Sequence, residues 1–110
     1  MASYLVQVSY TSEAWSALIA KPHDRSGVVG KVIEKLGGKT IGSWLAFGDY
    51  DLVMITEMPN NVSAAALSLA AAAGGSCKTV KTTPLLTIAQ GLSALRKAGT
   101  SGYKPIGAAK

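Results

Sequence analysis

The chain has 110 residues, of which 48% are hydrophobic, and a formal net charge of +5. This length suits one domain with one modest hydrophobic core. No segment approaches the roughly 18 consecutive apolar residues of a membrane span, and the start of the chain lacks the pattern of a signal peptide. We therefore expect a cytoplasmic protein without a membrane partner.

The charged residues are unevenly distributed along the chain. Residues 1–57 contain all six acidic residues, whereas residues 58–110 contain six basic residues and no acidic one. Runs of adjacent Lys and Arg never exceed two, which is a weak footprint for nucleic-acid binding. The aromatic motif with which RNA-recognition domains stack bases is also missing, so we expect no nucleic-acid partner.

The first part of the chain predicts one strand and two helices. Tyr and Val alternate with Leu, Gln and Ser through residues 4–10, which is typical of a strand. Ser12 is the expected N-cap of a short helix, which Pro22 interrupts. Residues 28–36 then place Val, Ile and Leu at helical spacing, and Gly37-Gly38 end this second helix.

A hairpin is predicted over residues 39–58. Gly48-Asp49 is a two-residue turn signal of the Gly-X kind, because Gly accepts the positive φ that a type II′ turn requires. Residues 39–47 and 50–58 are then the two strands. The second strand is apolar on both sides, which indicates a central strand covered on both faces.

The remaining residues predict a helix, a strand and a further helix. An Asn at the Asn60-Asn61 pair caps an Ala- and Leu-rich helix over residues 62–73, and residues 77–83 form the last strand. Pro84 then begins a C-terminal helix. The apolar stripe of this helix consists of Leu85, Ile88, Ala89, Leu92 and Leu95.

The element order β-α-β-β-α-β is that of the ferredoxin-like fold. We therefore predict a single α+β domain over residues 1–98, with an antiparallel sheet, helices on one face and a C-terminal helix, and a flexible tail over residues 99–110. Because the third strand is apolar on both sides, the helix-free face needs a cover, and a second subunit would supply it. Two such sheets packed face to face form a dimeric α+β barrel.

The predicted turn fixes the register of the hairpin and hence the residues on each face. The face toward the helices is predicted to hold the pairs Phe47/Tyr50, Leu45/Leu52, Ser43/Met54 and Ile41/Thr56. The opposite face is predicted to hold the pairs Ala46/Asp51, Trp44/Val53, Gly42/Ile55 and Thr40/Glu57.

This second, helix-free face is the predicted ligand site, because a mostly apolar surface with a few convergent polar groups is typical of small-molecule sites. Its candidate ligand-binding residues are Asp51, Trp44, Gln7, Ser9 and Glu57. Three structural alternatives stand beside this interpretation. In these, Asp51 bonds backbone groups at the hairpin end, Glu57 pairs with a lysine, and Trp44 packs at a subunit interface.

Asp51 and His23 are the candidate catalytic residues. His23 is the single histidine, so one chain cannot build a histidine cluster for a metal, and we expect neither a metal nor another cofactor. Asp24 beside it suits the start of a helix. Cys77 is the single cysteine, which excludes an internal disulfide, and its expected role is that of a buried, inert thiol.

Several short segments occur in a recognisable order. Gly48-Asp49-Tyr50-Asp51 is followed by an apolar strand that ends in Glu57-x-Pro59, and Tyr4-Leu5-Val6, Ser9-Tyr10-Thr11 and Leu36-Gly37-Gly38-Lys39 precede it. Over residues 3–85 this order resembles the GYD domain family of small bacterial proteins. The resemblance implies a ferredoxin-like relative of the dimeric α+β barrels, without an assigned activity. The 25 residues that follow exceed what it implies, and their amphipathic helix could build a larger assembly.

Two functions follow from these predictions. The first is a homo-oligomeric barrel that binds a small organic molecule in a cavity on the sheet face away from the helices. The second is a non-catalytic assembly or regulatory module, in which the sheet face and the C-terminal helix serve subunit contacts. The sequence leaves open whether the protein is an enzyme.

Overall fold

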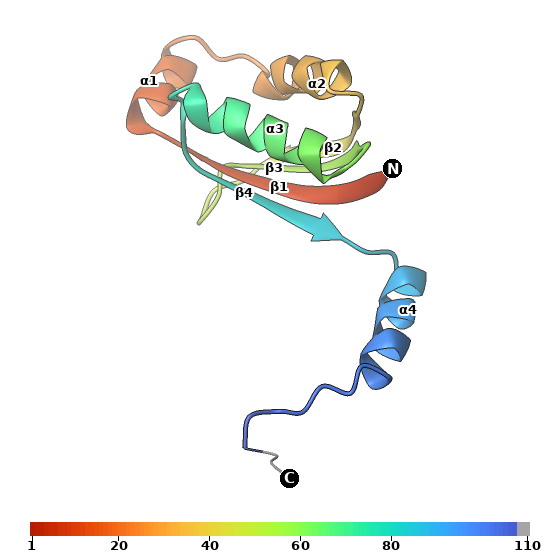
Figure 1. Ribbon diagram of the computed structural model, residues 1–110. Coiled ribbons are helices and arrows are strands. Elements are labelled where there is room, and N and C mark those ends of the chain that lie inside the picture. The colour runs from red at the N-terminus through yellow and green to blue at the C-terminus, as the bar shows by residue number, and fades with distance from the viewer. Residues whose placement is uncertain (108–110) are drawn as a thin grey trace.

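Four antiparallel strands form one sheet in the order β2-β3-β1-β4 in the computed structural model of the protein, which describes residues 1–107. The elements are β1 (Ala2–Tyr10), α1 (Ser12–Ala20), α2 (Arg25–Lys35), β2 (Lys39–Leu45), β3 (Leu52–Met58), α3 (Asn61–Ala73), β4 (Cys77–Leu85) and α4 (Ile88–Gly99). Helices α1, α2 and α3 lie on the same face of the sheet (Figure 1). This arrangement confirms the predicted ferredoxin-like α+β fold.

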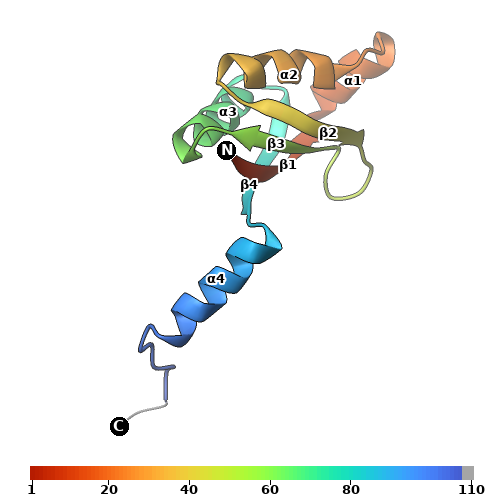
Figure 2. The ribbon, with the colours of Figure 1, turned by 90° about the vertical axis from the view of Figure 1, so that its right-hand side faces the viewer.

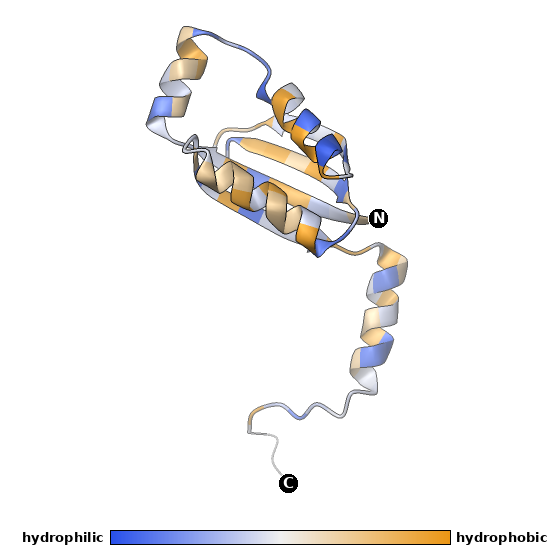
Figure 3. Cartoon of the chain, turned by 45° about the horizontal axis from the view of Figure 1, so that its top comes forward, coloured by the Kyte–Doolittle hydropathy of each residue, from blue (hydrophilic) through white to orange (hydrophobic). Residues whose placement is uncertain are grey.

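The helix-covered face of the sheet holds the hydrophobic core. Alternate residues of the two central strands are buried, from Tyr4 to Tyr10 in β1 and from Leu52 to Met58 in β3, and most residues between them are half-buried. Ile33 of α2 is fully buried against this layer. Figure 3 shows the hydrophobic strands beneath α2 and α3. The period of two therefore predicted the inward-facing residues of both central strands correctly.

Side chains that accept hydrogen bonds begin each of the first three helices. Thr11 accepts a bond from the Ala14 amide at the start of α1, so the prediction that Ser12 is the N-cap is wrong by one residue. Asp24 and Asn60 cap α2 and α3 in the same way, as expected for residues that satisfy free helical amides. Thr11 succeeds because it is the last extended residue after β1.

Gly37 ends α2 in the left-handed conformation, with a φ of 89°. The Gly38 amide donates to the Ile33 carbonyl and the Gly37 amide to the Glu34 carbonyl, each at 3.0 Å. These two bonds form a Schellman motif, which satisfies carbonyls that the helix leaves open. The glycine pair therefore acts as the predicted helix stop.

The hairpin between β2 and β3 differs from the prediction in its turn. The Ala46 amide donates to the Asp51 carbonyl at 2.7 Å, which closes a loop over residues 47–50 instead of a two-residue turn at Gly48-Asp49. Phe47 is 100% exposed, so its predicted packing on the helices is wrong. Contacts with β1, described below, hold this loop open.

The register of the hairpin is as predicted near the loop and shifts farther away. Leu45↔Leu52, Trp44↔Val53, Ser43↔Met54 and Gly42↔Ile55 are the observed partners. An irregularity between Thr40 and Gly42 then pairs Thr40 with Thr56 and Lys39 with Glu57, so the predicted pairs Ile41/Thr56 and Thr40/Glu57 are wrong. One extra residue in a strand has this effect, because two residues then oppose one on the partner strand.

Strand β4 is longer than predicted, and α4 begins later. Pro84 lies within β4 opposite Tyr4 instead of starting the helix. An edge strand tolerates proline, because a missing amide on its open side breaks no ladder bond. Thr87 and Gln90 form a capping box at the start of α4.

Helix α4 stands apart from the sheet and its three covering helices (Figures 1 and 2). The radius of gyration is 17.8 Å, whereas a compact chain of this length has about 13 Å. Ile88, Leu92 and Leu95 are 84%, 46% and 69% exposed, so the predicted apolar stripe has no partner within residues 1–107.

The chain beyond α4 forms neither helix nor strand through residue 107. The last three positions of the predicted tail, residues 108–110, lie outside the described residues. No helix in the described part of the chain is long and apolar enough to cross a membrane.

Candidate functional site

Two of the predicted ligand-binding residues share the helix-free face. Gln7 of β1 and Trp44 of β2 both lie opposite Val53 of β3, from its two sides. The indole of Trp44 lies over Gly42, where a Cβ atom would come within 2.6 Å of it, and remains 55% exposed. This part of the face is therefore an aromatic and aliphatic surface with one amide at its side.

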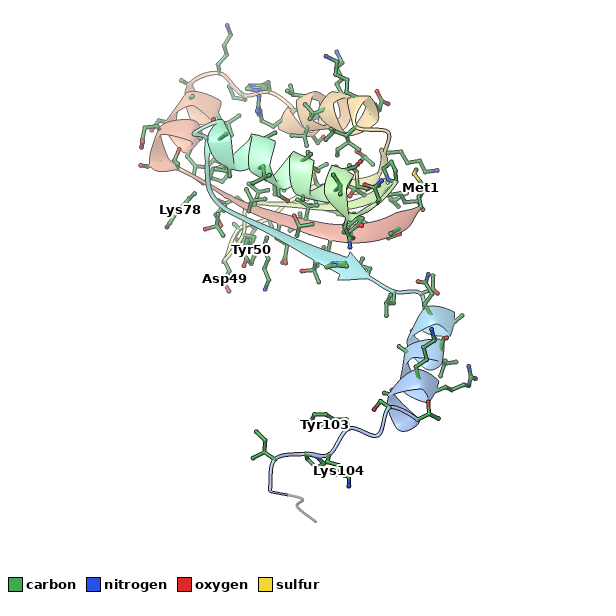
Figure 4. The ribbon with its side chains drawn as sticks, in the orientation of Figure 1. Met1, Asp49, Tyr50, Lys78, Tyr103 and Lys104 are labelled. Carbon is green, nitrogen blue, oxygen red and sulfur yellow. The ribbon has the colours of Figure 1, made fainter. Side chains whose placement is uncertain are left out.

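Ser9 and Asp51 attach the hairpin loop to the end of β1. The Asp51 carboxylate accepts a hydrogen bond from the Tyr10 amide at 2.9 Å, and the Ser9 hydroxyl donates to the Asp49 carbonyl at 2.9 Å. The Asp51 amide also donates to the Val8 carbonyl at 2.7 Å. Asp51 thus bonds a backbone group at the hairpin end, which was the predicted alternative to a role in ligand binding. Figure 4 shows Asp49 and Tyr50 on the side of the sheet away from the helices, so the prediction that Tyr50 faces the helices is wrong.

Glu57 lies apart from this group. It is six residues along β3 from Asp51, which corresponds to about 20 Å in a strand. Its carboxylate is 3.9 Å from the Lys39 ammonium group, which is the predicted pairing with a lysine. The fold therefore does not gather the five predicted ligand residues at one point.

An apolar groove of about 220 Å³ lies on the opposite, helix-covered face, between α2 and α3. Its floor consists of side chains from β1 and β3, and its walls are the two helices. Representative lining residues are Val6, Val8, Met54, Val29, Leu67 and Ala71. The groove exists because the small alanines of α3 and the valines of α2 leave space above the central strands.

A second cavity of about 380 Å³ adjoins the groove, beneath the connection from α1 to α2. Two of the predicted site residues are among its lining: His23, and Trp44, which belongs to the edge strand β2 and keeps its indole over Gly42 on the helix-free face. The His23 ring nitrogen Nδ1 lies 3.1 Å from the Lys21 carbonyl, in an exposed position. Tyr10, Arg25 and Leu52 line both cavities and therefore mark the junction between them.

Three polar side chains meet where the groove ends. Tyr10, Arg25 and Cys77 all line the groove, and the Arg25 guanidinium acts on the ionisation of the other two. Burial raises the pKa of the Tyr10 phenol and of the Cys77 thiol, while Arg25 opposes each rise by favouring the charged form. Both groups are consequently protonated at neutral pH.

Sequence reasoning missed Tyr10 and Arg25 as site residues. Tyr10 is the last inward-facing residue of β1, and its ring packs edge to face on Trp15 with centroids 5.4 Å apart. Arg25 is the first residue of α2, after the cap Asp24. A cation at a helix start is unfavourable for the helix dipole, and that anomaly was the available signal.

Metal binding has no ready site in the part of the chain that the structure describes. No group of three or more His, Cys, Asp and Glu side chains comes together there. The donors available to a ligand in the groove include the Tyr10 hydroxyl and the Arg25 guanidinium at the junction of the two cavities, and the Cys77 thiol in the groove alone.

Comparison with known protein families assigns the chain to one of them. The family model of the GYD domain matches residues 4–95. The chain belongs to the GYD domain family. The match reaches ten residues beyond the predicted limit at residue 85 and includes most of α4, so the prediction of a 25-residue extension outside the family was wrong. Neither a curated protein nor a solved structure matches the chain significantly.

Proposed function

We propose that this GYD domain protein is a homo-oligomeric α+β-barrel protein that binds a small organic molecule in the groove between α2 and α3. The groove is the observation that supports this proposal, because small-molecule sites are concave, mostly apolar and supplied with a few polar groups. The proposal keeps the predicted ligand class and moves its site from the helix-free face to the helix-covered one.

Subunit pairing through the helix-free face accounts for the surface that remains. Leu5, Val53 and Ile55 are half-buried there, and the Trp44 indole is more than half exposed. A contiguous apolar surface of this kind is typical of a protein interface. Two copies that bury it against each other would leave both helix-covered grooves open.

Light scattering on two matched variants tests the pairing. We expect the wild type to have at least twice the mass of one chain, and Ile55→Lys to have the mass of one chain. Ile19→Lys places the same substitution on α1, where Ile19 is 76% exposed, and should keep the wild-type mass. A monomeric wild type, or an unchanged mass for Ile55→Lys, would contradict the pairing.

A neutral probe tests the groove separately. 1-Naphthalenemethanol has a two-ring body that suits the groove, and its binding is followed by amide shifts in NMR spectra. Ala71→Phe fills the groove and should abolish the shifts, whereas Ala72→Phe adds the same ring to an exposed position one residue on. Equal effects of the two variants would rule out the site, as would a failure of the wild type to bind both this probe and its charged analogues described below.

A second candidate function is the assembly or regulatory module, which the unpartnered stripe of α4 favours. Here α4 makes a subunit contact and the groove is packing space. The double variant Leu92→Glu/Leu95→Glu should then lower the mass in light scattering. An unchanged mass, together with probe binding in the groove, leaves small-molecule binding as the function.

A further inference from the structure

We infer that the ligand of the groove between α2 and α3 is an organic anion, with an apolar body on β1 and β3 and a negatively charged group at Arg25 and Tyr10. This inference rests on the proposed function and adds the chemical class of the ligand. It follows from the charges along the groove, from the hydrogen bonds that the nearby carboxylates already accept, and from the hydrogen-bond donors at the end of the groove.

Arg25 is the one charged residue among those that line the groove. The other lining residues are apolar or neutral, and no acid is among them. Its side chain is half-buried at the start of α2. A guanidinium presents five donors in a planar fork and suits carboxylates and related anions. The groove therefore attracts a negative group at one end and repels a positive one.

The nearby carboxylates are bound to other partners. Asp24 accepts hydrogen bonds from the amide and the hydroxyl of Ser26, and Asp51 accepts one from the Tyr10 amide. Within residues 1–107 the only ion pair is Lys39 with Glu57, at the far end of β3. The Arg25 guanidinium is thus left without an internal counterion.

Neutral donors accompany Arg25 at the same end of the groove. The Tyr10 phenol and the Cys77 thiol are both protonated at neutral pH, because burial raises the pKa of each. A protonated phenol can donate a hydrogen bond to an anion, and such charge-assisted bonds are stronger than neutral ones. Together the phenol and the guanidinium make a site for the head group, and the valines beyond them take the body.

The size of the groove limits the apolar body. A cavity of about 150 Å³ holds benzene, so the 220 Å³ of this groove fits a body of about two fused rings. The adjoining cavity of about 380 Å³, which Asp24 also lines, leaves room for water around the head group at Arg25 and Tyr10. Compounds built on naphthalene are therefore suitable probes.

Three probes with one body and different charges test the inference. These are 1-naphthoate, 1-naphthalenemethanol and 1-naphthylmethylamine, titrated into the full-length protein at pH 7 and followed by NMR amide shifts. We expect 1-naphthoate to bind about tenfold more tightly than the alcohol, because it gains one charge-assisted contact. The amine should bind least.

Variants at the two arginines of the chain assign the effect to one position. Arg25→Gln should weaken 1-naphthoate about tenfold and change the alcohol less than twofold, whereas Arg25→Lys keeps the charge and most of the affinity. Arg96→Gln makes the same change on α4 and should alter neither. The spectrum of each variant without ligand reports whether it folds.

The outcomes separate the inference from the proposed function. Tighter binding of 1-naphthoate that is lost only in Arg25→Gln supports the organic anion. Equal binding of the alcohol and the acid, or an acid affinity unchanged in Arg25→Gln, overturns the anion and leaves the groove as a site. Failure of all three probes to shift the amides of Val29 and Ala71 overturns the groove itself.

Discussion

The two faces of the sheet are made from the same strands but hold different surfaces. On the helix-covered face Met54 is 1% exposed and packs in the core, whereas its neighbour Ile55 on the helix-free face is only half-buried. Two apolar residues side by side in one strand thus have different roles. The comparison teaches that both faces are apolar enough to pack against another surface. The position of the helices determines which of the two faces is buried within one chain.

Truncation of these two neighbours is the strongest test of the comparison. We expect Met54→Ala to lower the free energy of unfolding by about 2–5 kcal/mol, because it removes buried contacts and leaves a cavity. Ile55→Ala should cost less in dilute protein, and its cost should rise with protein concentration if subunits pair through it. Urea unfolding at two protein concentrations measures both. If Met54→Ala and Ile55→Ala lowered the free energy of unfolding equally at both protein concentrations, the two faces would not differ in their roles.

The alternation along β1 and β3 could be predicted from the sequence because it is local. Tyr4, Val6 and Val8 recur at a spacing of two, and the hairpin partners from Leu45 to Gly42 followed from one turn position. The shift at Thr40 could not be predicted in this way. It depends on how the edge strand fits against β3, and no residue beside it signals an extra position.

The candidate site could be predicted only in part, for a different reason. His23 and Trp44 are predicted site residues that line the second cavity, but the polar end of the groove consists of Arg25, Tyr10 and Cys77, which were not predicted to form a site. These three residues come from α2, β1 and β4, which are distant in the sequence. They meet only when α2 docks on the sheet, so no local pattern reports their proximity.

A substitution in the hairpin loop tests whether side-chain hydrogen bonds attach this loop to the end of β1. Asp51→Ala removes the carboxylate that accepts the Tyr10 amide bond at 2.9 Å. We expect a loss of about 1–2 kcal/mol in the free energy of unfolding, because hydrogen bonds to charged groups stabilise a fold more than hydrogen bonds between neutral groups. Asp49→Ala is the control, because Asp49 contributes its backbone carbonyl and keeps it. Equal losses for the two variants would mean that the Asp51 side chain is incidental.

Thr56 is the one polar residue that β3 presents to the helix-covered face. It is 0% exposed, and its hydroxyl has no hydrogen-bond partner among the described residues. Replacement of an unsatisfied buried hydroxyl by a methyl group of similar shape removes a desolvation cost. Thr56→Val should therefore stabilise the protein by about 1 kcal/mol, seen as a higher urea midpoint with an unchanged slope. A destabilised variant would show that this hydroxyl is needed.

The helix layer above this face adds a smaller, pH-dependent effect through Asp24. Hydrogen bonds from the Ser26 hydroxyl, and then from the Ser26 amide, lower the pKa of the Asp24 carboxyl below its usual value of 3.8. A lowered pKa in the folded state stabilises the protein above the unfolded value, and the contribution is lost as the pH falls through the folded value. Asp24→Asn keeps an amide acceptor at the cap without the titrating group. The urea midpoints of the wild type and Asp24→Asn should therefore differ at pH 7 and converge as the pH falls below 3.8. A constant difference between the two midpoints across this range would exclude Asp24 as the titrating group.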